Sequence, residues 1–323
     1  MRLKNSTYII AEIGSNHNGK LELAKDHIIQ AKKSGANAVK FQVFKSKYFF
    51  KKNTKSYKYI KKFEFNLKWI NQIEKLCKKL KIDFILSFFN SNDLKPEIIK
   101  KIDAIKIASS EVINHDLIIK SAKTNKPIIL STGMSNLSEI YEAIELIEYN
   151  GNNKIFILQC SSIYPTLDNE LNLNVIDTYK KMFNYKVGFS DHSKSIISTL
   201  VAVSKGAKII EKHFTIDNSL EGPDHFYALN PIQFKKMSLT IKRVNKMLGS
   251  YNKKPLKNEL KFCRRDSLFL NKNLKKNSKV KPQDFSIKQP QIGIPSKYLN
   301  KLGKMKLNRN LKSGSVLKWK DIF

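Results

Sequence analysis

Short apolar runs alternate with amphipathic stretches from Tyr8 to Leu248, and this alternation limits the possible fold more than any other feature of the sequence. Eight runs predict strands, at Tyr8–Ile13, Ala38–Phe44, Phe84–Phe89, Ala104–Ser109, Pro127–Thr132, Ile155–Cys160, Lys186–Ser190 and Ala207–Phe214. Helices are expected at Leu21–Ser34, Leu67–Leu80, Asp93–Ile102, Asp116–Thr124, Leu137–Tyr149, Val175–Phe183, Ser195–Lys205 and Pro231–Leu248. About eight alternating units predict an α/β fold, a (β/α)8 TIM barrel with a parallel sheet.

The alternation stops near Leu248, where the composition changes. Residues 249–263 are polar and predict a linker, and residues 264–323 are short segments interrupted by Asn, Gly and Pro. We therefore expect a barrel domain at 1–248, a linker at 249–263 and a small, mostly β domain at 264–323. A piece of about sixty residues has a marginal core, so it should pack against its own barrel or a second subunit.

The formal net charge of +33 raises the question of a polyanionic partner. Only five of the 60 basic residues are arginine, the residue that reads guanine and phosphate in bidentate fashion. The lysines are scattered, and no nucleic-acid-binding signature is present. We interpret the charge as a solvated surface that also attracts anionic substrates, and we expect no nucleic-acid partner.

Three further features bear on the compartment. No run of about eighteen apolar residues exists, which predicts no membrane insertion. The N-terminus has no signal-peptide core. Cys77, Cys160 and Cys263 are too few and too widely spaced for a disulfide framework or a zinc cluster. Together these features favour a reducing, cytoplasmic setting.

Two of the expected strands end in histidine, at His192 and His213, with one helical stretch between them. In a (β/α)8 barrel the C-terminal strand ends carry the active site. Two neutral imidazoles there would leave coordination positions open for water and substrate, which is typical of a catalytic metal site. The other histidines considered, His17, His27 and His115, are read as core or surface residues.

Two lysines interrupt apolar strands, Lys40 and Lys106. A lysine is rarely buried without a partner, so the pair, with hydroxyls from neighbouring strands, predicts a site for phosphate or carboxylate. Alternatively, each lysine pairs with Glu12 or Glu111, which are also candidate general acid–base groups. Cys160 is a weaker candidate, as a nucleophile.

These strand ends form an ordered set of motifs over nearly the whole chain. The motifs are Ile10–Gly19, Ala38–Gln42, Ile105–Glu111, Lys126–Met134, Gln159–Thr166, Gly188–Ser193, Glu211–Thr215 and Glu221–His225. With them the chain resembles the sialic acid synthase family. Its tail, through Ser286–Pro295 and Leu307–Gly314, is similar to the SAF (antifreeze-like, β-clip) domain that follows the barrel in that family.

The resemblance implies a transferase that condenses phosphoenolpyruvate with N-acetylmannosamine, cleaves a C–O bond, releases phosphate and forms N-acetylneuraminate. A diacetamido-deoxyhexose acceptor, giving N,N'-diacetyllegionaminate or pseudaminate, is the alternative within the family. A metal-independent relative that makes a shorter ulosonic acid fits the SAF tail less well. From another class, a noncatalytic glycan- or polyanion-binding barrel remains a hypothesis. It would show salt-dependent association without turnover.

The resemblance also implies roles for individual residues. A divalent metal, Mn2+ or Mg2+, would be held by His192 and His213 and act as a Lewis acid. Glu12 would act near the developing alkoxide, and Glu111 would handle the proton of water. The residues implied to bind phosphoenolpyruvate are Lys40, Ser87, Lys106, Ser109, Ser131 and Ser190. Those implied to bind the sugar are Gln42, Ser162, Tyr164, Asp224 and, from the second subunit of a domain-swapped homodimer, Arg309.

One stretch bears on the acceptor. The segment Lys45–Phe63, which follows the second expected strand, is rich in lysine. Because it follows a strand end of the expected active-site face, we expect it to influence acceptor choice, together with Ser162.

Overall fold

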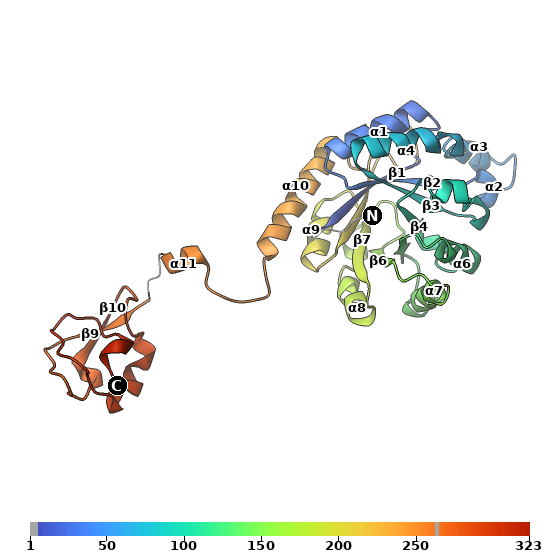
Figure 1. Cartoon of the computed structure of the whole chain (residues 1–323). Coiled ribbons are helices and arrows are strands. Elements are labelled where there is room, and N and C mark those ends of the chain that lie inside the picture. Colours follow the sequence, from blue (N-terminus) through green and yellow to red (C-terminus); the bar gives the residue numbers. More distant parts are fainter. Residues whose placement is uncertain (1–5, 262–264) are drawn as a thin grey trace. The chain divides into compact units, whose positions relative to one another are not determined.

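The computed structural model describes residues 6–261 and 265–323 of the chain. The chain divides into two compact units, Met1–Gly249 and Ser250–Phe323 (Figure 1). Cys263, the last residue of the expected linker, and Arg264, the first residue of the expected second domain, lie outside the described residues.

The first unit is a closed barrel of eight parallel strands in chain order, which confirms the predicted (β/α)8 fold. The strands are β1 (Tyr8–Gly14), β2 (Ala38–Val43), β3 (Asp83–Phe88), β4 (Ala104–Ile107), β5 (Ile128–Ser131), β6 (Ile155–Cys160), β7 (Lys186–Asp191) and β8 (Ile209–His213). The helices, seen around the outside of the barrel in Figure 1, include α1 (Leu21–Lys33), α4 (Ile70–Leu80), α6 (His115–Lys123), α7 (Leu137–Tyr149), α8 (Val175–Met182), α9 (Ile197–Ser204) and α10 (Pro231–Leu248).

Two regions differ from the expected helices. The helix expected at Asp93–Ile102 is only the single turn α5 (Pro96–Ile99). Pro96 disfavours the α-helical conformation of the residue before it, so the helix cannot begin earlier. The lysine-rich segment after β2, for which no helix was predicted, forms two short helices, α2 (Ser46–Phe49) and α3 (Lys55–Lys61). Thr54 caps α3, since its side chain accepts a hydrogen bond of 3.1 Å from the Tyr57 amide.

The barrel strands are buried on both faces and hold two separate cores. The larger core lies between strands and helices and includes Val39, Phe41 and Ile105. The smaller core fills the barrel interior, where side chains repeat with a period of two along each strand. Its buried members are Tyr8, Ile10, Ala38, Ile85, Ala104, Ile129, Leu158 and Ile209. The next inward positions, two residues further along each strand, are polar and open the functional site.

The second unit is small and mostly β, as expected. Strands β9 (Ser267–Leu270) and β10 (Phe285–Lys288) pair antiparallel, and isolated bridges such as Leu274 with Leu311 extend the pairing. Leu268, Ile294 and Leu317 are fully buried in its core. A short helix, α11 (Lys257–Lys261), precedes this domain. Within the described part of the chain, no helix has the length and apolarity needed to cross a membrane.

Candidate active site

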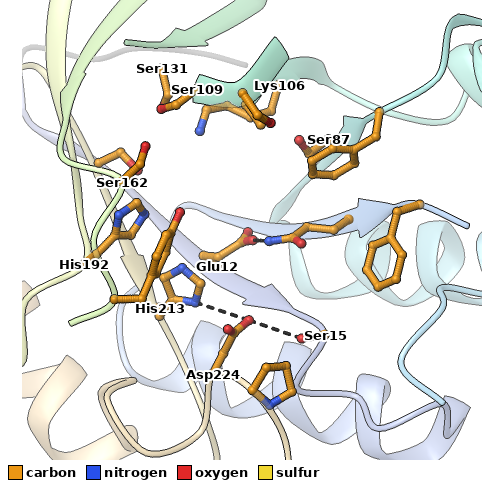
Figure 2. Close-up of a pocket in the computed structure, with 18 of the residues that line it drawn as sticks. Glu12, Ser15, Ser87, Lys106, Ser109, Ser131, Ser162, His192, His213 and Asp224 are labelled. Carbon is orange, nitrogen blue, oxygen red and sulfur yellow. Dashed lines mark hydrogen bonds and ion pairs between the residues drawn. The ribbon is translucent and has the colours of Figure 1, made fainter. Parts of the chain in front are cut away.

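A cavity of about 590 Å3 opens at the C-terminal ends of the barrel strands, where barrel enzymes carry their active sites. Of the predicted site residues that belong to the barrel, all except Glu111 line it. These lining residues are Glu12, Lys40, Gln42, Ser87, Lys106, Ser109, Ser131, Ser162, Tyr164, Ser190, His192, His213 and Asp224. Figure 2 shows Lys106, Ser109 and Ser131 on one side and His213 with Asp224 on the other, with Glu12 between.

The register of the parallel strands brings these side chains together. Glu12 of β1 stands beside Lys40 of β2 and beside His213 of β8. On β8, Glu211 precedes His213 by two residues and stands beside Ser190 of β7. Because alternate residues of a strand face the same side, all of these side chains enter the barrel mouth.

Two carboxylates and two lysines form a buried network at the cavity floor. Glu211 Oε1 lies 2.9 Å from Lys106 Nζ and 3.4 Å from Lys40 Nζ, and it accepts a 3.0 Å hydrogen bond from the Ser190 hydroxyl. Glu12 Oε2 lies 3.0 Å from Lys40 Nζ, and its other oxygen accepts a 2.6 Å hydrogen bond from Gln42. The alternative interpretation of lysine pairing thus holds for Glu12 and Lys40.

The pKa values of Glu12 and Glu211 are shifted in opposite directions. Burial raises the pKa of Glu12, and Lys40 only partly offsets this effect. Burial acts on Glu211 in the same direction, but Lys106 and Lys40 lower its pKa to about 2. Burial lowers the pKa of Lys106, whereas Glu12 and Glu211 overcome burial and raise that of Lys40. These surroundings favour the ionised form of Glu211 and the protonated form of Glu12, so Glu12 is the candidate for proton exchange.

Several buried hydroxyls around this network have no hydrogen-bond partner among the described residues. They are those of Ser87, Ser131 and Ser162. Buried polar groups in native proteins are nearly always hydrogen-bonded, and leaving one unpaired costs about 1–3 kcal/mol. Together with the lysine ammonium groups, these free donors fit an anion with several oxygens, such as phosphate or carboxylate.

The histidine pair lies at the opposite side of the cavity. The rings of His192 and His213 are 5.4 Å apart, and the Tyr164 ring stacks on His192 at 4.0 Å. His192 Nδ1 lies 2.7 Å from the Ser161 carbonyl oxygen, so Nδ1 carries the proton and the Nε2 lone pair is available. Burial lowers the pKa of both rings to about 3, which keeps them neutral, as metal ligands must be.

The carboxylate of Asp224 completes this side of the site. Asp224 Oδ2 lies 3.8 Å from His213 Nδ1, and Asp224 accepts hydrogen bonds of 2.8 Å from Tyr227 and 3.2 Å from Ser15. Over residues 6–261 and 265–323, no cluster of three or more His, Cys, Asp or Glu is arranged as a metal site. Two neutral imidazoles beside a carboxylate nevertheless suit a divalent cation that keeps water and substrate ligands.

Behind the histidines, a buried ion pair supports the ends of β7 and β8. Lys212 Nζ lies 2.7 Å from Asp191 Oδ2, and Asp191 also accepts a 2.6 Å hydrogen bond from Ser198 of α9. These side chains alternate with His192 and His213 along their strands. They hold the backbone of both histidines without entering the cavity.

The buried histidines predict a steep loss of stability on acidification. Burial lowers the pKa of His192 and His213 to about 3 and of His17 and His27 to about 4, from 6.5. Below pH 6.5 the unfolded chain therefore binds more protons than the folded chain. The stability from each histidine is complete above that pH and falls by up to about 1.4 kcal/mol per pH unit as the pH drops.

Urea unfolding with chelator present, at about pH 7.5, 6 and 5, checks this expectation. The dependence of the free energy of unfolding on pH should be weaker in His27→Gln, which removes one buried ring. It should be unchanged in His115→Gln, whose ring is 46% exposed. Equal stability at all three values would contradict the prediction.

Glu111 is not among the residues that line the cavity. Glu111 is buried beside it, accepting hydrogen bonds of 2.7 Å from Asn114 and 3.0 Å from Ser110. Arg309 belongs to the second unit, where its guanidinium lies 2.7 Å from Asp321. Glu111 thus pairs with polar neighbours and with neither Lys40 nor Lys106.

Three side chains at the site, Glu211, Ser15 and Tyr227, had no role predicted from the sequence, although Glu211 stands in one of the strand-end motifs. The signal for Glu211 was present, because it lies two residues before His213 in the same strand. Ser15 and Tyr227 lie in loops, where no periodicity indicates direction. Cys160 does line the cavity, 3.9 Å from His192 Nδ1, but burial raises the pKa of its thiol, which disfavours a nucleophilic thiolate.

Comparison with known proteins shows the family to which the chain belongs. Residues 27–253 match the NeuB family, and residues 265–322 match the SAF domain. The chain is 40% identical to an uncharacterized protein of Methanocaldococcus jannaschii, over 98% of this chain and 94% of that protein. It is 38% identical to an N,N'-diacetyllegionaminic acid synthase of Campylobacter jejuni, over 97% of this chain and 99% of that protein.

A solved structure agrees with these matches. The N-acetylneuraminic acid synthetase of Leptospira borgpetersenii superposes with a TM-score of 0.75 at 34% identity, covering 80% of this chain and 90% of that one. Other relatives are synthases of pseudaminic acid and of N-acetylneuraminate 9-phosphate. The resemblance inferred from the strand-end motifs is confirmed: the chain belongs to the NeuB family, whose members include sialic, legionaminic and pseudaminic acid synthases.

Proposed function

We propose that this protein condenses phosphoenolpyruvate with the open-chain aldehyde of an N-acetylated amino sugar, forming a nine-carbon ulosonic acid and phosphate. The acceptor is N-acetylmannosamine, giving N-acetylneuraminate, or a diacetamido-deoxyhexose. One observation carries the proposal: buried serine hydroxyls with no partner among the described residues surround two buried lysines in a cavity that also holds two neutral histidines.

The lysine and serine side would take phosphoenolpyruvate. Lys40 and Lys106 are held by Glu12 and Glu211, and their ammonium groups would donate hydrogen bonds to the phosphate and carboxylate and offset part of their charge. The hydroxyls of Ser87, Ser109 and Ser131 add directed donors. Ser190, whose hydroxyl donates to Glu211, lines the same cavity. Because these groups sit on rigid strands, the enol carbon is held in a fixed direction toward the histidine side.

The histidine side would take the aldehyde. His192 and His213 would hold the divalent metal, which supplies Lewis-acid polarisation of the aldehyde oxygen when bound. Mg2+ is bound chiefly through oxygen ligands, so a pair of imidazoles favours Mn2+ of the two expected ions. Gln42, Ser162, Tyr164 and Asp224 line the remaining space around the sugar chain.

Bond formation requires a proton donor near the aldehyde. As the enol carbon of phosphoenolpyruvate attacks the aldehyde carbon, the carbonyl oxygen becomes an alkoxide. Glu12, whose pKa burial raises, is positioned between the two sides of the cavity and would protonate that oxygen. Glu211 stays ionised and keeps Lys106 charged during this step.

Water then completes the reaction. Attack of water on the cationic carbon that bears the phosphate oxygen gives a tetrahedral intermediate. Its collapse breaks the C–O bond, forms the ketone and releases phosphate, with the two water protons passing to bases. The role of Glu111 as one of these bases stays a prediction, as do the cytoplasmic setting and the domain-swapped homodimer in which Arg309 would reach the partner barrel's sugar.

Phosphate release tests the proposal. We expect release from phosphoenolpyruvate with N-acetylmannosamine or a diacetamido-deoxyhexose, and loss of release with chelator. Ser131→Ala should raise the KM for phosphoenolpyruvate at least about tenfold with a smaller change in kcat, because a hydrogen bond to a charged group contributes about 1.5–3 kcal/mol. The control Ser204→Ala, at an exposed position of α9, should leave both unchanged. Salt-dependent binding to heparin without turnover would instead favour the noncatalytic hypothesis.

A further inference from the structure

One side of the active-site cavity is apolar and is not used by the reacting groups. We call it the apolar wall. Its members are Phe44, Phe49, Phe50, Ile60, Phe63 and Phe89. None of these side chains has a polar atom, so the wall offers no hydrogen bond to a ligand hydroxyl.

The wall continues the inward-facing positions of β2 and β3 beyond the polar floor. Phe44 follows Gln42 by two residues, and Phe89 follows Ser87 by two residues. Both rings come directly after the strand ends and line the same cavity as Gln42 and Ser87, which are assigned to the substrates. The wall is therefore part of the substrate cavity, on the side that α2 and α3 cover.

The rings are packed against one another. The Phe49 ring lies 5.5 Å from the Phe89 ring and 6.0 Å from the Phe44 ring, and the Phe44 and Phe89 rings are 6.3 Å apart. These separations are typical of stabilising aromatic pairs. Phe44 is buried, but Phe49 and Phe50 are 46% and 38% exposed, so apolar ring surface remains available to a ligand.

Polar contacts outside the cavity hold this segment in place. The Ser46 amide, at the start of α2, donates a 2.7 Å hydrogen bond to Glu64 Oε1. The Tyr48 hydroxyl donates a 3.2 Å hydrogen bond to Asp93. The wall is thus pre-formed, and a ligand does not have to order it.

The positions of the lysines in this segment do not favour a phosphorylated acceptor. Residues 45–62 contain eight lysines, yet none of them is among the residues that line the cavity. Lys47 and Lys61 lie over the rings of Tyr48 and Tyr57. A phosphate on the far end of the acceptor would meet the apolar wall with no lysine of this segment lining it.

We propose that the apolar wall selects an acceptor whose far end carries methyl groups, the diacetamido-deoxyhexose, over N-acetylmannosamine and its phosphate ester. This rests on the proposed function, since it places the aldehyde of the same acceptor at the histidines. The second acetamido methyl and the deoxy carbon bury apolar surface on the rings. Hydroxyls at the same positions lose their hydrogen bonds to water without replacement.

Acceptor competition under saturating phosphoenolpyruvate tests the assignment. The wild-type protein should turn over the diacetamido-deoxyhexose with a kcat/KM at least about tenfold above that for N-acetylmannosamine. In Phe49→Ala/Phe50→Ala this ratio should fall by about tenfold, while the KM for phosphoenolpyruvate stays constant. Tyr149→Ala, which removes a 90% exposed ring at the end of α7, is the matched control.

The outcomes separate the two proposals. Equal or better turnover of N-acetylmannosamine, or a ratio that the double substitution leaves unchanged, would overturn the role of the wall and leave the proposed reaction intact. Phosphate release with neither sugar would overturn the proposed reaction, and the assignment of the wall with it. Thermal unfolding of each variant establishes that the barrel is folded, and Phe49→Leu should keep most of the selectivity.

Discussion

Glu211→Gln should destabilise the barrel by about 3–5 kcal/mol, because it removes the carboxylate that faces both buried lysines. Lys106 Nζ lies 2.9 Å from Glu211 and is fully enclosed, so without that charge its ammonium group is buried unpaired. Lys40 keeps Glu12 at 3.0 Å and loses less. Urea unfolding gives the free energy directly.

A double substitution makes this prediction specific. Replacing Lys106 by Met together with Glu211→Gln removes both charges, so part of the lost stability should return. Glu221→Gln removes an exposed carboxylate and should change the free energy of unfolding by less than about 0.5 kcal/mol. A Glu211→Gln protein as stable as the wild type would contradict the interpretation of Glu211 as the central anion.

The double variant His192→Asn/His213→Asn should lose at least about a thousandfold in phosphate release. Metal polarisation of a carbonyl contributes several kcal/mol to catalysis, and each 1.36 kcal/mol is a factor of ten in rate. Binding of Mn2+ to the double variant, measured by equilibrium dialysis, should fall to background. Since the wild-type rings are neutral and buried, neutral asparagines should leave the fold intact.

The control for this prediction is the surface variant His115→Gln, which should keep both turnover and Mn2+ binding. Turnover that is undiminished in the double variant would contradict the metal assignment. Loss of turnover with full Mn2+ binding would mean that other residues hold the metal and that the histidines act on the substrate directly.

The sequence was informative wherever periodicity controlled the structure. Each of the eight strands was predicted within a few residues, because parallel barrel strands are buried on both faces and appear as continuous apolar runs. A polar residue in or at the end of such a run must enter the barrel mouth or be paired. This argument identified Lys40, Lys106, His192 and His213 as candidate site residues.

Loops and long-range pairing limited the prediction. Helices α2 and α3 are short and rich in lysine, so their apolar face is contributed by only a few rings and gives no clear period. Glu211 could be seen at a strand end, but its contact with Lys106 joins residues 105 positions apart, and no local pattern encodes that distance. Glu111 follows β4 in a 3-10 turn, where a strand-based direction no longer holds.

The layered interior of the barrel has a consequence for how such a protein can change over time. Along β2 and β3 an apolar inward position is followed, at steps of two, by polar ones, and the apolar rings of Phe44 and Phe89 come directly after the strand ends. Inserting or deleting one residue within either strand would turn every later inward-facing side chain of that strand toward the helices. The lysine and serine side of the cavity can therefore change only by substitution of residues, without a change in strand length. Beyond Val43 no such constraint applies. The segment that carries most of the apolar wall can therefore become longer or shorter, or be replaced as a whole. Acceptor preference can then diversify while the lysine network stays the same.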